Sequence, residues 1–173
     1  MDQVRRKRIR LPASNYEAGW YFVTIRTDHR MNFLANVTPT VGADDSVRPC
    51  VALEGYTSRL TPIGLAVREC LERLTDAVHG IVVDKYIIMP NHVHAIICLS
   101  AGTGGQSRPP LQGVIQRFKS VSTRQGWKHG VKKLWQRSFF DHVIRCEEEY
   151  RRIWQYIDDN PAKWAEDEYY SAE

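Results

Sequence analysis

The stretch "DKYIIMPNHVHAIICL" at residues 84–99 decides the fold. Two apolar runs lie on either side of Pro90 and Asn91, and each run has the length of a buried β-strand. So short a connection predicts that strands at 80–89 and 92–99 pair antiparallel. His92 and His94 interrupt the second run. Because residues i and i+2 of a strand point to the same face, the two imidazoles are expected on one side of the sheet.

The neighbouring segments predict further strands and helices. "GWYFVTIRT" (19–27) is rich in β-branched and aromatic residues, which is typical of a strand. "LTPIGLAVRECLERLTDAV" (60–78) has helical apolar spacing, with Thr61 as the expected N-cap and Pro62 at the first helical position. Between these two, residues 28–60 hold many turn formers, and we expect a short strand in "VRPCVALE" (47–54) that pairs with "NFLANV" (32–37).

The second half of the chain continues the alternation. "LQGVIQRFKSVSTRQGW" (111–127) predicts a second amphipathic helix, and "LWQRSFFDHVIRC" (134–146) predicts a strand or a strand pair. "EEEYRRIWQYIDDNPAKW" (147–164) predicts a third helix that ends near Asn160, since the residue before a proline avoids the helical region. This order predicts one α+β domain over residues 1–173, a sandwich with a largely antiparallel sheet, and a basic N-terminal arm of about residues 1–12.

The composition argues against a membrane-spanning or secreted protein. No apolar run approaches the ~18 residues of a membrane span, and no signal-peptide core follows the N-terminus. The four cysteines form no C-x-x-C pair, so reduced thiols are expected rather than a zinc ribbon or a redox motif. We therefore expect a cytoplasmic protein that does not bind membranes.

The charges are unevenly distributed along a chain whose net charge is only +4. Residues 101–140 contain no Asp or Glu, whereas residues 147–173 are acidic. Such segregation favours a nucleic-acid partner over a solvated surface without one. The basic residues expected to contact DNA are Arg5, Arg6, Lys7, Arg8, Arg10, Arg117, Lys119, Arg124, Lys128, Lys132, Lys133 and Arg137. Trp127 and Trp135 are candidates for base stacking, although packing is the ordinary role of each.

Two histidines on one strand face can bind a single metal ion if a third ligand comes from elsewhere. Asn160, on the third predicted helix, offers an amide oxygen that suits Mg²⁺ or Mn²⁺. Tyr156 is four residues earlier, hence on the same helical face, and a phenol near a metal-bound phosphate is a candidate nucleophile. The residues alone leave two other interpretations open: half-buried histidines bonded to the backbone, and a tyrosine that only packs in the core.

Several motifs together resemble a known family. "YIIMPNHVHAII" resembles the HUH motif of the single-tyrosine transposases, in which U is a bulky apolar residue, here Val93. The N-terminal "RKRIRLPASNYEAGWYFVTIRTDHR", "FKSVSTRQ" (118–125) and "LWQRSFFDHVIRCEEEYRRIWQYIDDNPAKW" (134–164) are similar to the REP-associated tyrosine transposases in particular. The chain departs from the pattern at His142, where we expect a basic or polar residue.

The resemblance implies a fold, a site and a reaction. It implies a ferredoxin-like sheet that carries the HUH motif, with His92, His94 and Asn160 as ligands of Mg²⁺ or Mn²⁺. It also implies that Tyr156, on the C-terminal helix, attacks single-stranded DNA beside hairpin-forming repeats and forms a 5′-phosphotyrosine link. We expect a monomer or a homodimer. The alternatives are a DNA-hairpin-binding protein without activity, and a zinc hydrolase that uses the H-x-H pair.

Overall fold

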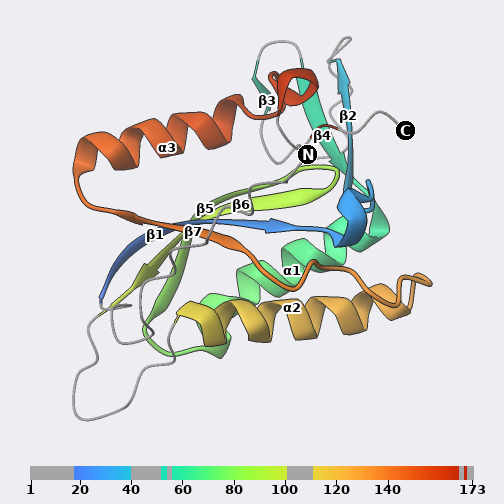
Figure 1. Ribbon diagram of the computed structural model, residues 1–173, viewed down its shortest axis with the longest axis horizontal. Coiled ribbons are helices and arrows are strands. Elements are labelled where there is room, and N and C mark those ends of the chain that lie inside the picture. The colour runs from blue at the N-terminus through green and yellow to red at the C-terminus, as the bar shows by residue number, and fades with distance from the viewer. Residues whose placement is uncertain (1–17, 40–51, 54–55, 101–110, 168–169, 171–173) are drawn as a thin grey trace, which may run out of the picture.

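The computed structural model describes residues 18–39, 52–53, 56–100, 111–167 and 170. Its main sheet has the strand order β5-β6-β1-β7, and all neighbouring strands are antiparallel (Figure 1). These strands are β1 (Gly19–Arg26), β5 (Ile81–Ile88), β6 (His92–Leu99) and β7 (Phe140–Ile144). Between β1 and β5 the chain forms a smaller sheet and then helix α1 (Pro62–Ala77). Helix α2 (Leu111–Trp127) lies between β6 and β7 in the sequence. The strand and helix order is that of a ferredoxin-like α+β sandwich, as predicted.

The sheet is covered on both faces. Helices α1 and α2 lie along one face, and α3 (Glu147–Asp159) crosses the other (Figure 1). Strand β1 serves both layers, because Val23 and Ile25 belong to the core under α1 and α2 whereas Phe22 belongs to the core under α3. Two apolar layers therefore meet at the central strands.

Strand β6 is buried almost throughout because it is an inner strand with a helix layer on each side. Val93, Ala95 and Ile97 pack toward α1 and α2, and the alternate residue Ile96 packs toward α3. The continuous apolar run in the sequence follows from this double burial. By the same alternation His92 and His94 lie on the α3 face.

The start of α1 confirms the predicted cap. Thr61 Oγ1 accepts a hydrogen bond from the Gly64 amide at 3.0 Å, and Pro62 opens the helix. A Cβ at Gly64 would lie 1.9 Å from the carbonyl oxygen of Leu34, so this turn of α1 can approach the preceding chain only with glycine.

An irregularity in β5 fastens α3 to the sheet. The register with β6 shifts between Val83 and Lys85, which leaves Asp84 as an extra residue, as in a β-bulge. Asp84 accepts a 2.5 Å hydrogen bond from the Tyr150 hydroxyl, and Lys85 forms a 2.5 Å ion pair with Asp158. Both partners are on α3, so consecutive residues of one strand secure the same helix.

The predicted pairing of 32–37 with 47–54 is wrong. Strand β2 (Ala35–Pro39) and the short β3 (Ala52–Leu53) both pair with β4 (Tyr56–Leu60), in the order β2-β4-β3. Strand β4 was not expected, because its sequence "YTSRL" (56–60) is short and mostly polar. Of the predicted strand or strand pair at 134–146, the structure has β7 and a single bridge between Thr27 and Trp135.

Two further points concern the predicted boundaries. Among the described residues no helix is long and apolar enough to cross a membrane. The predicted basic arm, with Arg5, Arg6, Lys7, Arg8 and Arg10, lies outside the described residues. Its role as a DNA contact stays a prediction.

Candidate active site

The two histidines of β6 lie side by side beneath α3. His92 and His94 are 0% and 1% exposed, and their ring centroids are 4.5 Å apart. They open the strand directly after the Pro90–Asn91 connection, so the rigid end of an inner strand positions both rings. The shared face predicted from the spacing is confirmed.

Each imidazole is oriented through its Nδ1 atom. His94 Nδ1 lies 2.8 Å from Thr24 Oγ1 on the neighbouring strand, and His92 Nδ1 lies 3.0 Å from Asn91 Oδ1. Contacts of this kind fix the ring and its tautomer, which leaves Nε2 as the atom that faces a ligand. Nε2 of His94 points toward Tyr156, and Nε2 of His92 points toward Asp167.

Both imidazoles are neutral at physiological pH. Burial lowers the pKa of His94 to about 3. Burial also holds the pKa of His92 well below its usual value. The neighbouring His94 and the charge of Arg26 lower the pKa further, although a contact with the Asn160 side chain acts in the opposite direction. Neutral imidazole is the form that binds a metal ion.

Asn160 reaches the histidines from the end of α3. It is 3% exposed, and its side chain lies close enough to His92 to raise the pKa of that ring. Its Oδ1 atom is buried, yet no donor among the described residues meets hydrogen-bond geometry there. A buried amide oxygen without a donor is costly, so a cation at this point would satisfy it. The observation fits the ligand role predicted for Asn160.

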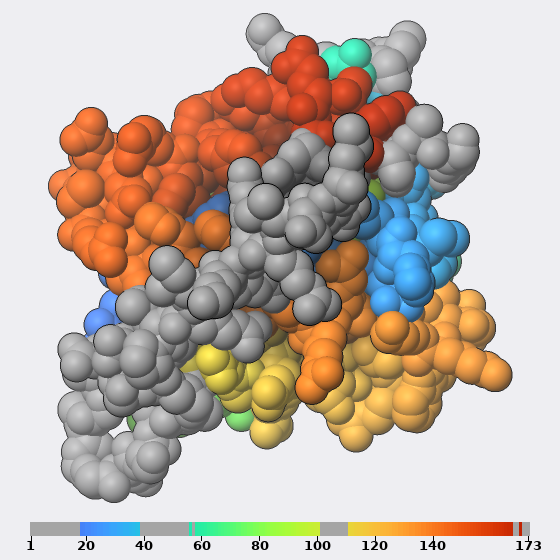
Figure 2. Space-filling model, viewed as in Figure 1, coloured from blue at the N-terminus to red at the C-terminus, as the bar shows by residue number. Residues whose placement is uncertain are grey.

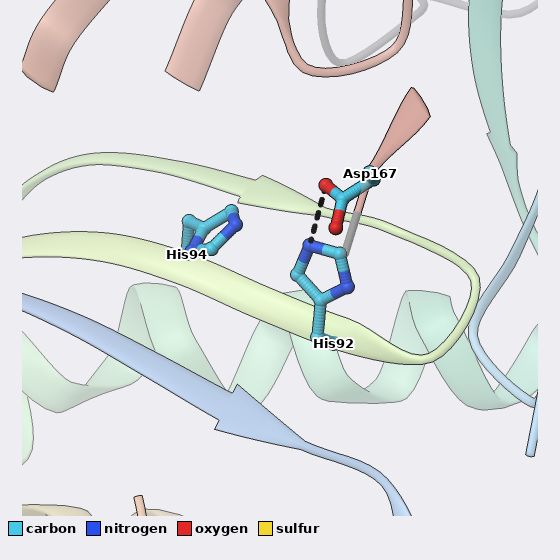
Figure 3. Close-up of side chains that lie close together, drawn as sticks. All are labelled: His92, His94 and Asp167. Carbon is cyan, nitrogen blue, oxygen red and sulfur yellow. Dashed lines mark ion pairs between the residues drawn. The ribbon is translucent and has the colours of Figure 1, made fainter. Parts of the chain in front are cut away.

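Asp167 is a site residue that the sequence analysis missed. It follows the short helix η3 (Trp164–Glu166), in the chain that returns over the sheet after α3. One Asp167 oxygen lies 4.0 Å from His92 Nε2, and the carboxylate points at the histidine pair (Figure 3). No local sequence motif predicts that Asp167 contacts His92, because Asp167 is one of several acids in the acidic C-terminal stretch.

These side chains fit a divalent cation. The ligand atoms of His92, His94 and Asp167 all lie within 4.8 Å of one another. Ligand atoms that share one ion lie about 3 to 4 Å apart, since metal–ligand bonds are about 2.1 Å long. Two nitrogens, a carboxylate and an amide oxygen make a mixed set, which suits Mn²⁺ better than Mg²⁺.

Tyr156 is the tyrosine that faces the histidines. Its hydroxyl lies 3.3 Å from His94 Nε2, and the residue is 41% exposed. The ring packs edge-on against Phe22, which holds it above the sheet without burying it. A phenol that is both next to the paired histidines and open to solvent has the geometry of a nucleophile.

Arg26 is a second residue that the sequence analysis missed. It is the last residue of β1 and pairs with His92 across the ladder, so both side chains share the α3 face. Its charge is near enough to lower the pKa of His92. It therefore adds positive potential where a phosphate would approach the tyrosine.

His142 and the two tryptophans have structural partners. His142 Nε2 lies 2.7 Å from Glu149 Oε1 at the start of α3, so it braces the helix rather than joining the metal ligands. Trp135 is buried, and its indole donates to Ser122 Oγ. Trp127 stays exposed, with its indole on the carbonyl of Lys132.

The predicted basic residues of the acid-free stretch lie away from the histidines. They follow α2 and the chain that leads into β7, and α2 covers the sheet face opposite α3 (Figure 1). The exposed members are Arg117, Arg124, Lys128, Lys132, Lys133 and Arg137. Lys119 instead donates to the carbonyls of Gln136 and Ser138, at 2.8 and 2.9 Å, which gives it a structural contact. Lys133 pairs with Asp28 at 2.9 Å.

Comparison with known proteins supports the resemblance drawn from the motifs. No family model matches the chain. It is 27% identical over 183 residues to an uncharacterised protein of Haemophilus influenzae, covering 95% of this chain and 93% of that one. It is also 28% identical over 81 residues to the REP-associated tyrosine transposase of Escherichia coli, covering 47% and 44% of the two chains.

The fold points the same way. The solved structure of a REP-associated tyrosine transposase bound to a REP hairpin superposes with a TM-score of 0.59 at 21% identity, covering 94% of this chain and 74% of that chain. The resemblance to the REP-associated tyrosine transposases is therefore confirmed, and the chain shares their α+β fold.

Proposed function

We propose that this chain, which has the fold of a REP-associated tyrosine transposase, nicks and rejoins single-stranded DNA beside hairpin-forming repeats with the help of a divalent metal ion. The observation that carries the proposal is the Tyr156 hydroxyl, 3.3 Å from Nε2 of a buried, neutral histidine. His92, His94, Asn160 and Asp167 are the proposed ligands. Similarity to a DNA transposase over part of the chain supports the substrate class.

In the proposed reaction Tyr156 is the nucleophile. Its oxygen attacks the scissile phosphorus, a 5′-phosphotyrosine bond forms, and the bond to the 3′-oxygen breaks. The proton that the phenol loses is balanced by the proton that the released 3′-hydroxyl gains. Attack by a 3′-hydroxyl on the phosphotyrosine reverses these steps and rejoins the strand.

The other residues position the phosphate. A divalent ion held by the proposed ligands would polarise the phosphoryl oxygens and stabilise the leaving oxygen. Arg26 would attract a non-bridging oxygen from the same face. Thr24 and Asn91 keep the two imidazoles aimed, through the contacts at their Nδ1 atoms.

The proposed partner is a DNA hairpin. The solved relative is bound to a REP hairpin. On this chain α2 and the following segment, which contain no acidic residue, offer Arg117, Arg124, Lys128, Lys132 and Arg137 to duplex phosphates. Lys119 is not part of this set, because its ammonium group donates hydrogen bonds to two backbone carbonyls. The basic arm keeps its proposed role.

A metal-dependent hydrolase is the second candidate, and Asp167 favours it. The sequence showed an H-x-H pair without a nearby third strong ligand, whereas the structure supplies a carboxylate. Two histidines and one carboxylate are also a hydrolytic zinc set. The exposed Tyr156 directly beside His94 favours the nicking and rejoining enzyme, because a hydrolase that activates water needs no phenol there.

One gel experiment separates the candidates. The protein is incubated with a labelled DNA hairpin that carries single-stranded flanks, with Mn²⁺ or with excess chelator, and is then denatured. Labelled DNA that stays covalently bound to protein only with Mn²⁺ supports the proposal. Cleavage without an adduct favours the hydrolase. Retention of DNA without cleavage favours a binding protein that lacks activity.

A further inference from the structure

Phe140 is an exposed aromatic residue on the same sheet face as the proposed active site. Thr24 of β1 pairs with His94 on one side and with Phe140 of β7 on the other. Directly paired residues point to the same face, so His94, Thr24 and Phe140 form one row across three strands. Neighbouring strands are about 4.8 Å apart, which puts Phe140 roughly 10 Å from His94.

The fold gives this ring no packing role. Phe140 is 54% exposed, and it belongs to neither of the apolar clusters formed by the described residues. Two residues on, and on the same face, His142 contacts Glu149 of α3. Helix α3 thus meets β7 near His142, while Phe140 stays exposed.

The position of β7 leaves room for a ligand. It is the edge strand beside β1, so within the described part of the chain no further strand of the main sheet lies beyond Phe140. Natural edge strands usually carry charged side chains, which prevent pairing with other chains. The chain leading into β7 reaches the surface between the α2 and α3 layers, where it is coloured orange in Figure 2. The Phe140 ring at this edge therefore does not fill space in the core, and it is accessible to solvent.

We propose that Phe140 is a stacking platform for a nucleobase next to the scissile phosphate. The inference rests on the function proposed above and adds a base-binding subsite to it. A flat ring accepts any base by stacking, and a row that begins at His94 places this base close to the reacting phosphate. Arg26 on the same face supplies the charge for the adjoining phosphates. Stacking would hold the flexible strand in line with Tyr156.

The test compares DNA with and without bases. Wild-type protein and the Phe140→Leu variant are titrated with a fluorescent single-stranded oligonucleotide, and with a base-free sugar–phosphate oligomer of the same length. Leucine keeps an apolar side chain but offers no aromatic face. We expect Phe140→Leu to weaken binding of the base-bearing strand by roughly 5- to 30-fold. Binding of the base-free strand should stay unchanged.

Two control variants complete the experiment. Phe140→Tyr restores an aromatic face and should restore wild-type affinity. Tyr56→Leu changes another exposed aromatic, on the small sheet, and should have no effect. Equal affinities for wild type and Phe140→Leu, or equal losses on both oligomers, would overturn the platform.

Failure of the platform is distinguishable from failure of the proposed function. If wild-type protein forms the covalent adduct while Phe140→Leu binds bases normally, only the platform is wrong. If wild-type protein binds neither oligomer, both proposals are wrong.

Discussion

Two tyrosines of α3 show how strongly the surroundings decide the chemistry of a residue. Tyr150 donates to Asp84, and burial together with that carboxylate raises its pKa to about 12, so its hydroxyl stays protonated and occupied. Tyr156 points at His94 and stays accessible. Both tyrosines lie on one helix, yet of the two only Tyr156 meets the requirements of the nucleophile proposed beside His94.

Substitutions at Asn160 test whether its amide oxygen binds the metal ion. Asn160→Asp keeps an oxygen in place and adds a negative charge that a divalent cation tolerates. Asn160→Ser is too short to supply that oxygen. We expect the Asp variant to retain cleavage and the Ser variant to need at least about tenfold more Mn²⁺ for half-maximal cleavage. Equal Mn²⁺ requirements for Ser and wild type would remove Asn160 from the ligand set.

The carboxylate of Asp167 is expected to contribute to metal affinity directly. Asp167→Asn keeps the shape and removes the charge, so Mn²⁺ should bind about ten- to a hundredfold more weakly, as measured by electron paramagnetic resonance without DNA. Asp159→Asn, a change of the same kind, is the control, because Asp159 pairs with Lys163 and Gln155 on the surface. Unchanged Mn²⁺ affinity in Asp167→Asn would limit the ligands to the histidines and Asn160.

The sequence predicted the site residues that local spacing connects. His92 and His94 share a strand face, and Tyr156 and Asn160 share a helix face, so short periodicities bring each pair together. Asp167 and Arg26 have no such link to the histidines. Their proximity depends on how the chain returns after α3 and on which strand lies beside β6, and a single sequence does not specify either contact.

At the scale of elements, α3 and its attachment to β5 decide whether the tyrosine sits over the histidines. The helix is fixed by Asp84 and Lys85 at the irregular part of β5 and by Glu149 against His142. The long periodic helices and the strands on either side of Pro90 and Asn91 were predicted correctly from their apolar patterns. Strand β4 was missed, because five residues with a polar majority give no periodic signal.

The attachment of α3 should weaken at high pH. The pKa of Tyr150 is raised to about 12 in the folded protein, above about 10 in the unfolded chain. A raised pKa means that the stabilisation is complete below about pH 10 and is lost as the pH rises toward 12. The midpoint of urea unfolding should therefore fall more steeply over this range in wild type than in Tyr150→Phe. Parallel curves for the two proteins would show that Tyr150 does not contribute.

At the scale of the whole molecule, the two faces of the sheet have different tasks in the proposed account. The face under α3 holds the proposed chemistry, and the α2 side carries the exposed basic residues of the acid-free stretch. In the proposed account, DNA that contacts both passes around the β7 edge, where Phe140 lies. This division was not visible in the sequence, in which the residues from Arg117 to Arg137 fall in one acid-free stretch, with no sign that α2 turns away from the histidines.

Salt dependence tests the basic surface. Arg117 and Arg124 are exposed on one face of α2, two turns apart. Changing both to Gln should reduce the slope of log affinity for hairpin DNA against log salt by about one to two. The double variant Arg73→Gln with Arg151→Gln removes two exposed cations on α1 and α3 and should leave the slope unchanged. The same slope in both double variants would place the DNA path elsewhere.

The central claim is that Tyr156 becomes covalently linked to DNA. The direct measurement is mass spectrometry of protein digested after incubation with a hairpin oligonucleotide and Mn²⁺. The account predicts a nucleotide-bearing peptide whose modification maps to the Tyr156 oxygen, and no such peptide from Tyr156→Phe, which should still bind the hairpin because the ring remains. A modification on another residue, or DNA cleavage that persists in Tyr156→Phe, would contradict the account.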